Sequence, residues 1–358
     1  MATVFAGLSG GVDSAVSAAL LKEQGHNVVG AFIKIWQPEF IECTWKEDRL
    51  DAMRVAVALG IPFREIDLSE SYQKHVVQDM LLGYERGITP NPDVLCNARI
   101  KFGEFFDWAR GEGADFIATG HYARIQENND LRSRYLLRGK DAAKDQSYFL
   151  YALSEDVLAR TLFPIGGMTK QEVRAKARHF NLPNAARPDS QGLCFVGEVS
   201  MKDFLARFIR VERGPVIDVE GRLVGEHEGA ALYTIGQRHG FRTRRDGNGS
   251  QYYVVAVDAA SNTIRVSKHR EDAACFKISL MSAHWIHEKP AFPFHCEVET
   301  RYRETPVRAE IREEEEGLGV QFEKPHIAAP GQSLVMYDGA HVLGGGIIQK
   351  SGQITADS

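Results

Sequence analysis

Two cysteines, Cys96 and Cys194, stand where a hydrophobic core position is not expected. Residues 90–97 read PNPDVLCN and residues 189–197 read DSQGLCFVG, so both cysteines have turn-forming neighbours. Loops of this kind would leave a thiol accessible for nucleophilic or redox chemistry. We therefore expect Cys96 and Cys194 to be exposed loop residues, and their pairing is the first question that the sequence raises.

The other cysteines do not suggest chemistry. Five cysteines in 358 residues are few and irregularly spaced, which argues against a disulfide framework. A single cysteine is usually a small buried hydrophobe, and Cys43, Cys275 and Cys296 are interpreted in that way. No CxxC pair or paired histidine spacing accompanies Cys96 or Cys194, so a metal site is not predicted.

A second chemical motif, GLSGGVDS, occupies residues 7–14. Its glycines allow a sharp turn that presents backbone N–H groups to an anion, and the following helix directs its positive end to the same place. The lysine of ordinary P-loops is absent, and the motif resembles the PP-loop of ATP pyrophosphatases. The alternative is a glycine-rich turn that only caps a helix. The predicted ATP-binding residues are Gly7, Leu8, Ser9, Gly10, Gly11, Val12, Asp13 and Ser14, and the Asp13 carboxylate with pyrophosphate oxygens would suit Mg²⁺.

The elements that position these motifs alternate between strand and helix patterns. Apolar runs predict strands at 3–8, 27–36, 62–68 and 115–120, and helical periodicity predicts helices at 12–24, 47–60 and 101–112. Such alternation is typical of a doubly wound parallel α/β sheet, which binds ligands at the carboxyl ends of its strands.

The pattern changes near residue 200. An amphipathic segment at 201–209 precedes short extended runs with glycine-rich turns, and the chain after Cys275 looks entirely β. We predict an α/β catalytic domain at 1–200, a small β-rich central domain at 201–270 and a C-terminal β-barrel at 271–358. The acidic run at 313–316 is interpreted as a solvated turn.

Composition limits the location and the partners. No run approaches the roughly 18 apolar residues of a membrane span, and residues 1–11 lack the pattern of a signal peptide, so a cytoplasmic protein is expected. The net charge of −5 does not indicate nucleic-acid binding, although a local basic face is compatible with it.

Several motifs occur in a characteristic order: SGGVDS, TPNPDVLCN (89–97), ATGHYAR (118–124), KDQSYFLY (144–151), DSQGLCFVG, TIGQRHG (234–240), TRYR (300–303), PGQS (330–333) and LGGGII (343–348). Together they resemble the tRNA-specific 2-thiouridylase family over essentially the whole chain. SGGVDS alone is shared by many ATP pyrophosphatases, whereas PNPD-x-x-CN with G-x-CF is far more specific.

The resemblance implies a use for both thiols. This family replaces the 2-carbonyl oxygen of the wobble uridine in tRNA with sulfur, after ATP has adenylated that oxygen and pyrophosphate has departed. By resemblance Cys194 carries a persulfide received from a sulfur-donor protein, and Cys96 is the second catalytic thiol. Transfer would leave a Cys96–Cys194 disulfide, which thiol exchange must reduce before another cycle.

Other roles also follow from the resemblance alone. Gly120 and Ile33 would contact the nucleotide, with Ile33 in a position where the family often has methionine. Asp93 would handle a proton as the oxygen is activated. The implied tRNA-contacting residues are Asn91, Pro92, Asp93, His121, Lys144, Asp145, Gln146, Arg301, Tyr302 and Gln332.

Two alternatives stay open. One is another PP-loop enzyme, such as an amide-forming synthetase or a lysidine synthase, although lysidine synthesis would give the cysteine pair no task. The other is a non-catalytic tRNA-binding or redox protein that has kept the fold, against which the intact SGGVDS and both cysteines argue.

Overall fold

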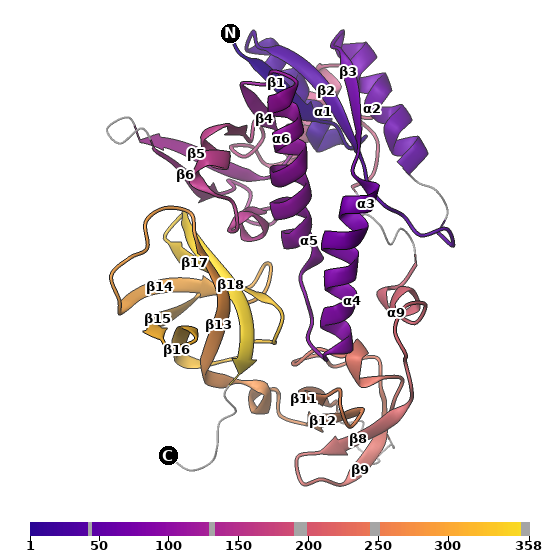
Figure 1. Ribbon diagram of the computed structural model, residues 1–358, viewed down its shortest axis with the longest axis vertical. Coiled ribbons are helices and arrows are strands. Elements are labelled where there is room, and N and C mark those ends of the chain that lie inside the picture. The colour runs from indigo at the N-terminus through magenta and orange to yellow at the C-terminus, as the bar shows by residue number, and fades with distance from the viewer. Residues whose placement is uncertain (42–44, 129–132, 190–198, 244–250, 352–358) are drawn as a thin grey trace.

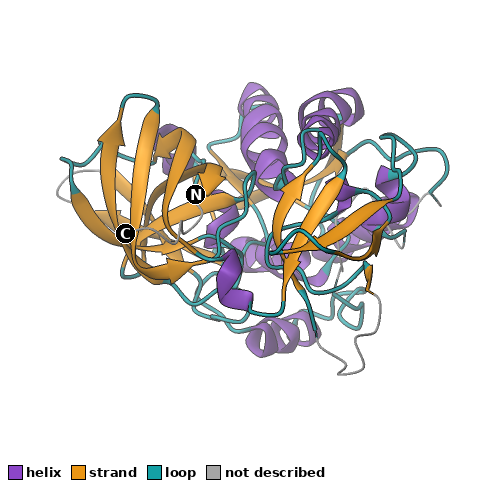
Figure 2. Cartoon of the chain, turned by 90° about the horizontal axis from the view of Figure 1, so that it is seen from below, coloured by secondary structure: helices purple, strands orange, loops and turns teal. Residues whose placement is uncertain are grey.

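The residues that the structure describes form three β-sheets joined by helices (Figure 1). The computed structural model describes the 358-residue chain except for residues 42–44, 129–132, 190–198, 244–250 and 352–358. Figure 2 shows the closed ring of C-terminal strands and the smaller central sheet as separate parts of the molecule.

The N-terminal sheet is parallel and has the strand order β3-β2-β1-β4-β7. Its strands are β1 (Thr3–Gly7), β2 (Asn27–Lys34), β3 (Phe63–Asp67), β4 (Phe116–Ala118) and β7 (Thr161–Leu162). The four strands predicted from apolar runs are present with slightly shorter bounds, whereas β7 was not predicted.

Helices cover both faces of this sheet because successive side chains of β1 point in opposite directions. Val4 and Ala6 pack with α1 (Val12–Glu23), α2 (Trp45–Leu59) and α8 (Lys170–His179). Phe5 belongs to the core on the other face, with the helical stretch 92–111. The predicted doubly wound sheet is therefore confirmed.

The sequence patterns predicted little of two long helical stretches. One runs through α3 (Ser69–Tyr72), the π-helix η1 (Gln73–Val77) and α4 (Gln78–Glu85). The other runs without a break through α5 (Pro92–Leu95), the π-helix η2 (Cys96–Glu104) and α6 (Phe105–Gly111). The helix predicted at 101–112 is thus only the second half of a longer one. The remaining helices are η3 (Ser147–Leu150), α7 (Glu155–Ala159), α9 (Met201–Leu205), η4 (Ala230–Leu232) and η5 (Arg270–Ala273).

The central sheet has the order β10-β9-β8-β12-β11, and β8 and β12 run parallel. Its strands are β8 (Gly214–Asp218), β9 (Leu223–His227), β10 (Arg242–Thr243), β11 (Tyr253–Asp258) and β12 (Thr263–Ser267). Val216, Val254 and Ile264 are fully buried in its small core. This agrees with the predicted β-rich central domain.

In the described part of the chain, six C-terminal strands close into a barrel because β13 also pairs with β18. They are β13 (Cys275–Trp285), β14 (Phe294–Glu299), β15 (Val307–Glu314), β16 (Gly317–His326), β17 (Ser333–Asp338) and β18 (His341–Ser351). The hairpin of β5 (Ala123–Asn128) and β6 (Ser133–Arg138) extends this sheet by pairing with β18. The predicted barrel is confirmed, and the exposed acidic residues 313–316 end β15 and form a turn.

All three regions meet at Thr89. Its N–H donates to the Pro330 carbonyl at 3.0 Å, and its hydroxyl lies 2.8 Å from that of Thr234 in the central region. Gly331 fits against this segment only because it lacks a Cβ, which would lie 2.9 Å from the Thr89 backbone. The two β regions therefore fix the backbone immediately before residue 91.

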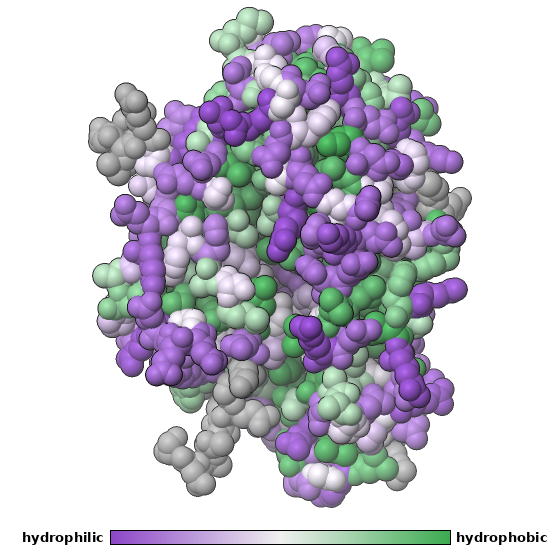
Figure 3. Space-filling view, in the orientation of Figure 1, coloured by the Kyte–Doolittle hydropathy of each residue, from purple (hydrophilic) through white to green (hydrophobic). Residues whose placement is uncertain are grey.

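The face shown in Figure 3 is mostly hydrophilic, with hydrophobic residues scattered between the charged ones. In the described residues, no helix is long and apolar enough to cross a membrane.

Candidate active site

The loop that joins β1 to α1 has the geometry of an anion-binding turn. Gly10 has a φ of +78°, a conformation that side-chain-bearing residues rarely adopt, and Gly11 is the N-cap of α1. The Ser14 hydroxyl donates to the Gly11 carbonyl at 3.0 Å and accepts from the Ser9 N–H at 3.2 Å. The N-cap Gly11 has no side chain to cap α1, so the first backbone N–H groups of the helix lack that partner and are candidate donors to an anion.

Neighbouring elements hold this loop in place. The Gly10 carbonyl accepts from the Asn184 amide at 2.8 Å and from the Arg187 guanidinium at 3.2 Å. At the end of β4, a Cβ on Gly120 would lie 2.6 Å from the Ser14 nitrogen. Gly120 is therefore required for close approach of this strand end to the loop, and its contact with a nucleotide stays a prediction. Leu8 and Val12 are buried beneath the loop, and Ile33 is half-buried near the end of β2.

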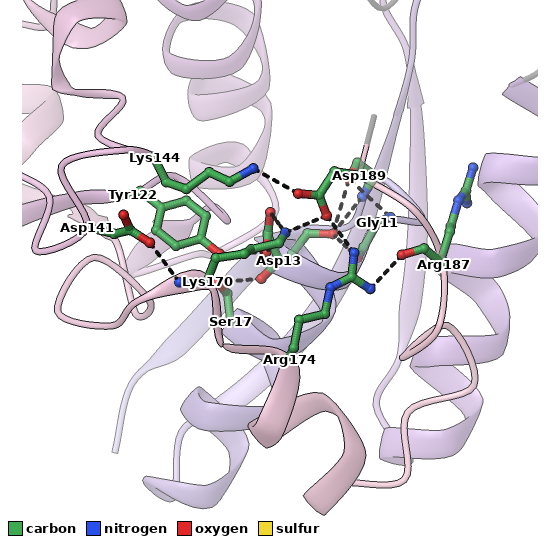
Figure 4. A network of polar contacts seen from close by, with 12 residues as sticks. Gly11, Asp13, Ser17, Tyr122, Asp141, Lys144, Lys170, Arg174, Arg187 and Asp189 are labelled. Atoms are coloured by element: carbon green, nitrogen blue, oxygen red, sulfur yellow. Dashed lines mark hydrogen bonds and ion pairs between the residues drawn. The ribbon is translucent and has the colours of Figure 1, made fainter. Parts of the chain in front are cut away.

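Asp13 belongs to an ion cluster that was not predicted (Figure 4). Lys170, the first residue of α8, donates to both Asp13 carboxylate oxygens at 2.8 and 2.9 Å. The Tyr122 hydroxyl donates to the same carboxylate at 2.9 Å. The only local signal for Lys170 was the sequence TKQE, since Thr169 and Glu172 form a capping box at the start of α8.

A second carboxylate, Asp189, completes this cluster. It lies 2.9 Å from the Lys144 ammonium, 2.8 Å from that of Lys170 and 2.5 Å from the Arg174 guanidinium. Although burial alone would raise the pKa of Asp189, bonds to Lys170 and Lys144 hold it well below its usual range. Lys144, which was predicted to contact tRNA, therefore lies beside the phosphate loop.

The expectation that Cys96 lies in an exposed loop is wrong. Cys96 is buried, with 7% of its surface exposed, and it begins the π-helical segment η2. The turn-like sequence before it is a helix start: the Asn91 side chain accepts from the Val94 N–H at 3.4 Å and Pro92 occupies the first helical position. Proline is favoured there because its missing N–H would have no helical partner.

The helix that carries Cys96 also places Asp93 and His121 in one electrostatic environment. Burial raises the pKa of Asp93, and the nearby Lys101 opposes this shift. Burial lowers the pKa of His121 well below its ordinary value, and Lys101 lowers it further. His121 lies 2.7 Å from the Thr119 hydroxyl and contacts the Phe102 ring, so it is a buried residue rather than a surface one.

Cys194 and Cys43 lie outside the described residues. Cys275 is buried in the barrel core, as predicted, and burial raises its thiol pKa to about 11. Cys296 is half-buried against the same core; burial and two acidic neighbours raise its pKa to about 12. Both thiols are therefore poor nucleophiles at neutral pH.

Three other residues with a predicted tRNA role bond to the protein's own backbone. The Asp145 carboxylate accepts from the Gly139 and Ser147 N–H groups at 2.8 and 3.0 Å. The Gln146 side chain accepts from the Tyr122 N–H at 3.0 Å. The Gln332 amide donates to the Thr89 carbonyl at 2.8 Å.

The remaining tRNA candidates lie in the turn that follows β14. Arg301 is exposed, while the Tyr302 ring packs 4.4 Å from that of Phe149 and beneath the Arg303 guanidinium. A large cavity, about 760 Å³, lies elsewhere between the β5–β6 hairpin and the barrel, lined by residues such as Tyr135 and Trp285. It is lined by none of the predicted site residues.

The donor set for a metal is small. No group of three or more His, Cys, Asp or Glu side chains that could hold an ion occurs in the residues that the structure describes. Mg²⁺ commonly uses one carboxylate together with substrate phosphates, and Asp13 lies at the phosphate loop. The site thus fits Mg²⁺ only in company with a nucleotide, and Lys170 now occupies both Asp13 oxygens.

Comparison with known proteins identifies the family of this chain. Three family models match in succession: a tRNA methyl transferase HUP domain at residues 2–198, a tRNA methyl transferase PRC-barrel domain at 202–268 and an aminomethyltransferase beta-barrel domain at 276–348. The tRNA-specific 2-thiouridylases MnmA of Yersinia pestis (strain Pestoides F) and Yersinia pseudotuberculosis serotype O:1b are each 42% identical over 98% of this chain and 97% of theirs. The chain belongs to the tRNA-specific 2-thiouridylase family.

Membership of the 2-thiouridylase family confirms the resemblance predicted from the motifs. Among solved structures, the U34-tRNA thiolase NcsA from Methanococcus maripaludis is 20% identical, with a TM-score of 0.36, over 54% of this chain and 62% of its own. The three matched regions contain, in order, the parallel sheet together with the β5–β6 hairpin, the central sheet and the strands of the barrel.

Proposed function

We propose that this protein is an ATP-dependent tRNA 2-thiouridine synthase, a sulfurtransferase. It would adenylate the 2-carbonyl oxygen of the wobble uridine and replace that oxygen with sulfur from a cysteine persulfide, giving 2-thiouridine, AMP and pyrophosphate. One observation carries the proposal: in a chain of the 2-thiouridylase family, a glycine phosphate loop is joined through residues 119–122 to the helix of Asp93 and Cys96.

The phosphate loop would bind ATP through backbone N–H groups. The start of α1 supplies donors and a positive helix end, and the Ser9 hydroxyl is an exposed neighbour. Ile33 and Gly120, at neighbouring strand ends, would contact the adenosine part. Asp13 would help to hold Mg²⁺ in company with the nucleotide, and the metal would supply charge neutralisation. The chain's own task is to hold the phosphates while the uridine oxygen attacks the α-phosphorus and pyrophosphate leaves.

Asp93 would manage the proton of the activated base. A pKa raised by burial brings its carboxyl closer to neutral pH, where a group exchanges protons most effectively. Asn91 and Pro92 begin the same helix and would meet the target base. Because Thr89 is fixed by the barrel and the central region, this segment would present the base in a defined position.

The two cysteines would then transfer sulfur. The outer sulfur of the Cys194 persulfide attacks C2 of the base, AMP leaves, and a C2–S–S–Cys194 linkage forms. The Cys96 thiolate attacks the Cys194 sulfur and breaks the S–S bond, leaving 2-thiouridine and a Cys96–Cys194 disulfide. A dithiol reductant supplies the two electrons that restore both thiols. A persulfide-carrying donor protein would reload Cys194, and a reducing cytoplasm suits this cycle.

The test is tRNA-dependent AMP release and nucleoside analysis, with and without a persulfide donor. Cys194→Ser should lose persulfide loading but still form some adenylated tRNA, whereas Cys96→Ser should load persulfide yet complete little transfer. Mass spectrometry of each variant after incubation with a donor decides the roles. Sulfur on Cys96 in the Cys194→Ser protein would reverse the assignment, and normal thiolation by either variant would end the relay.

The same assay separates the alternatives. A lysidine synthase or an amide-forming synthetase would release AMP with its own substrate and make no 2-thiouridine. A non-catalytic tRNA-binding protein would bind tRNA and release no AMP.

A further inference from the structure

Three cations converge on one carboxylate beside the phosphate loop. Lys144, Lys170 and Arg174 reach Asp189 from separate segments, and the view in Figure 4 shows their charged ends directed at the same point. All three side chains are partly buried, with 34%, 16% and 22% of their surface exposed. Such partly desolvated cations bind anions more strongly than fully exposed ones.

The two carboxylates of this cluster are a poor match for its three cations. Asp13 contacts only Lys170 among them, so Asp189 offers its two oxygens to all three cations, and two of the three share its Oδ1 atom. A di- or triphosphate brings more charge and more oxygens, and both lysine and arginine are common phosphate ligands. The cation arrangement therefore suits a polyphosphate better than the carboxylate that it holds.

Lys170 ties this cluster to the nucleotide loop. It bonds to Asp13, which follows the two glycines of that loop, and to Asp189 at the same time. The loop has no lysine of its own, unlike an ordinary P-loop, in which a lysine reaches the outer phosphates. Lys170 lies 157 residues after Asp13 in the sequence, on the first position of α8, and brings an ammonium group to this loop.

We propose that Lys144, Lys170 and Arg174 form the subsite for the outer phosphates of ATP and for the pyrophosphate that leaves, and that Asp189 competes with those phosphates for the three cations. This inference rests on the proposed function, in which ATP is the substrate. When the phosphates bind Lys170, the Asp13 carboxylate loses its ammonium partner and keeps the bond from the Tyr122 hydroxyl to Oδ1. Asp189 would thereby lower the affinity for polyphosphate and favour its release after adenylation.

The alternative is a structural ion cluster that only fastens α8 to the phosphate loop. The two interpretations predict opposite effects of the Asp189→Asn substitution on the affinity for polyphosphate. A structural cluster predicts that Asp189→Asn loosens the site and weakens every ligand. Competition predicts that the same substitution strengthens pyrophosphate and ATP binding, because the internal anion is removed while the cations stay.

The experiment is calorimetric titration of the full-length protein with pyrophosphate, ATP and AMP. Lys170→Met should lower the affinity for pyrophosphate and ATP about tenfold or more, which is the usual effect of losing a charge-assisted hydrogen bond. The affinity for AMP should change by less than about twofold. Lys176→Met is the matched control, because Lys176 lies on the same helix and pairs with Glu23 at 3.7 Å. That control should leave all three affinities unchanged.

Asp189→Asn should raise the affinity for pyrophosphate severalfold and leave the affinity for AMP unchanged. Lys144→Met keeps the Asp13–Lys170 pair and tests the subsite even if Lys170→Met does not fold, which thermal unfolding would reveal. The proposal is overturned if either lysine variant binds pyrophosphate like Lys176→Met, if ATP and AMP weaken equally, or if Asp189→Asn weakens pyrophosphate. Wild-type protein that binds no ATP would instead overturn the proposed function.

Discussion

Two adjacent glycines of the phosphate loop should respond very differently to alanine. Gly10 has a φ of +78°, and a Cβ there would lie 2.6 Å from the Asp48 carbonyl oxygen and 2.8 Å from the Arg187 guanidinium. Gly11 has an extended backbone with a φ of −79°, and its Cβ would only approach the Ser9 hydroxyl at 3.3 Å. Hydroxyls rotate away at little cost, whereas a backbone carbonyl in a packed core does not.

The magnitude follows from these contacts. A left-handed conformation costs a non-glycine residue about 1–2 kcal/mol, and the clash adds to this cost. Gly10→Ala should therefore lower the free energy of unfolding by about 2 kcal/mol or more. For a domain of this size, that corresponds to a melting temperature lower by about 4–8 °C. Gly11→Ala should lose about 0.5–1 kcal/mol of folding stability, since alanine is a poorer N-cap than glycine.

Differential scanning calorimetry and ATP titration of both variants check this prediction. Because Gly10 can relieve the clash only by moving the loop, its N–H groups would no longer converge, and ATP affinity should fall about tenfold or more in Gly10→Ala. Gly11→Ala should bind ATP within about threefold of wild type. Equal effects of the two substitutions, or wild-type ATP affinity in a folded Gly10→Ala protein, would refute the reasoning.

Three further predictions concern the base and tRNA sites. Burial raises the pKa of Asp93 above its value in the unfolded chain. The folded protein therefore loses stability as the pH rises from the unfolded pKa to the folded pKa of this carboxyl. Asp93→Asn should therefore melt higher than wild type at pH 7–8, with the difference disappearing near pH 4, while thiolation is lost. Arg301→Gln should weaken tRNA binding and reduce the salt slope by about one unit, measured by fluorescence anisotropy; an unchanged slope would remove Arg301 from the interface. Gln332→Leu, which deletes the 2.8 Å bond to Thr89, should slow thiolation without changing ATP affinity; weaker ATP binding would contradict this local role.

The N-terminal sheet could be predicted because its signals are local. Apolar runs, helical periodicity and the SGGVDS turn each depend on a few neighbouring residues. The structure contains the four predicted strands and the helices predicted at 12–24 and 47–60, whereas the helix predicted at 101–112 starts earlier and the two-residue strand β7 was not predicted. The PNPD segment failed for an instructive reason: proline favours turns and also the first position of a helix, and only the Asn91 cap decides between them here. The prediction of an exposed Cys96 failed with it.

The ion cluster could not be predicted because nothing local identifies it. Lys170 starts an ordinary capped helix, and its sequence does not indicate that the ammonium reaches Asp13 across 157 positions. That contact depends on α8 packing against α1, where Val173 and Ala177 share a core with Val12 and Val16. The two π-helical segments could not be predicted from the sequence either, because a π-helix differs from an α-helix by only one residue in the spacing of its hydrogen bonds.

The position of Thr89 suggests why the barrel and the central region belong to one enzyme. A free loop before Asn91 would let the segment that we propose to bind the base sample many positions, and a misplacement of about 1 Å can cost a reaction two orders of magnitude. Here Pro330, Gln332 and Thr234 fix Thr89 from two sides, and Thr89 lies two residues before Asn91, the N-cap of α5. Any tRNA contact that shifts the barrel would move Thr89 directly, whereas the phosphate loop is held by Asn184 and Arg187 within its own domain. Substitutions at this junction should therefore affect base positioning before they affect ATP.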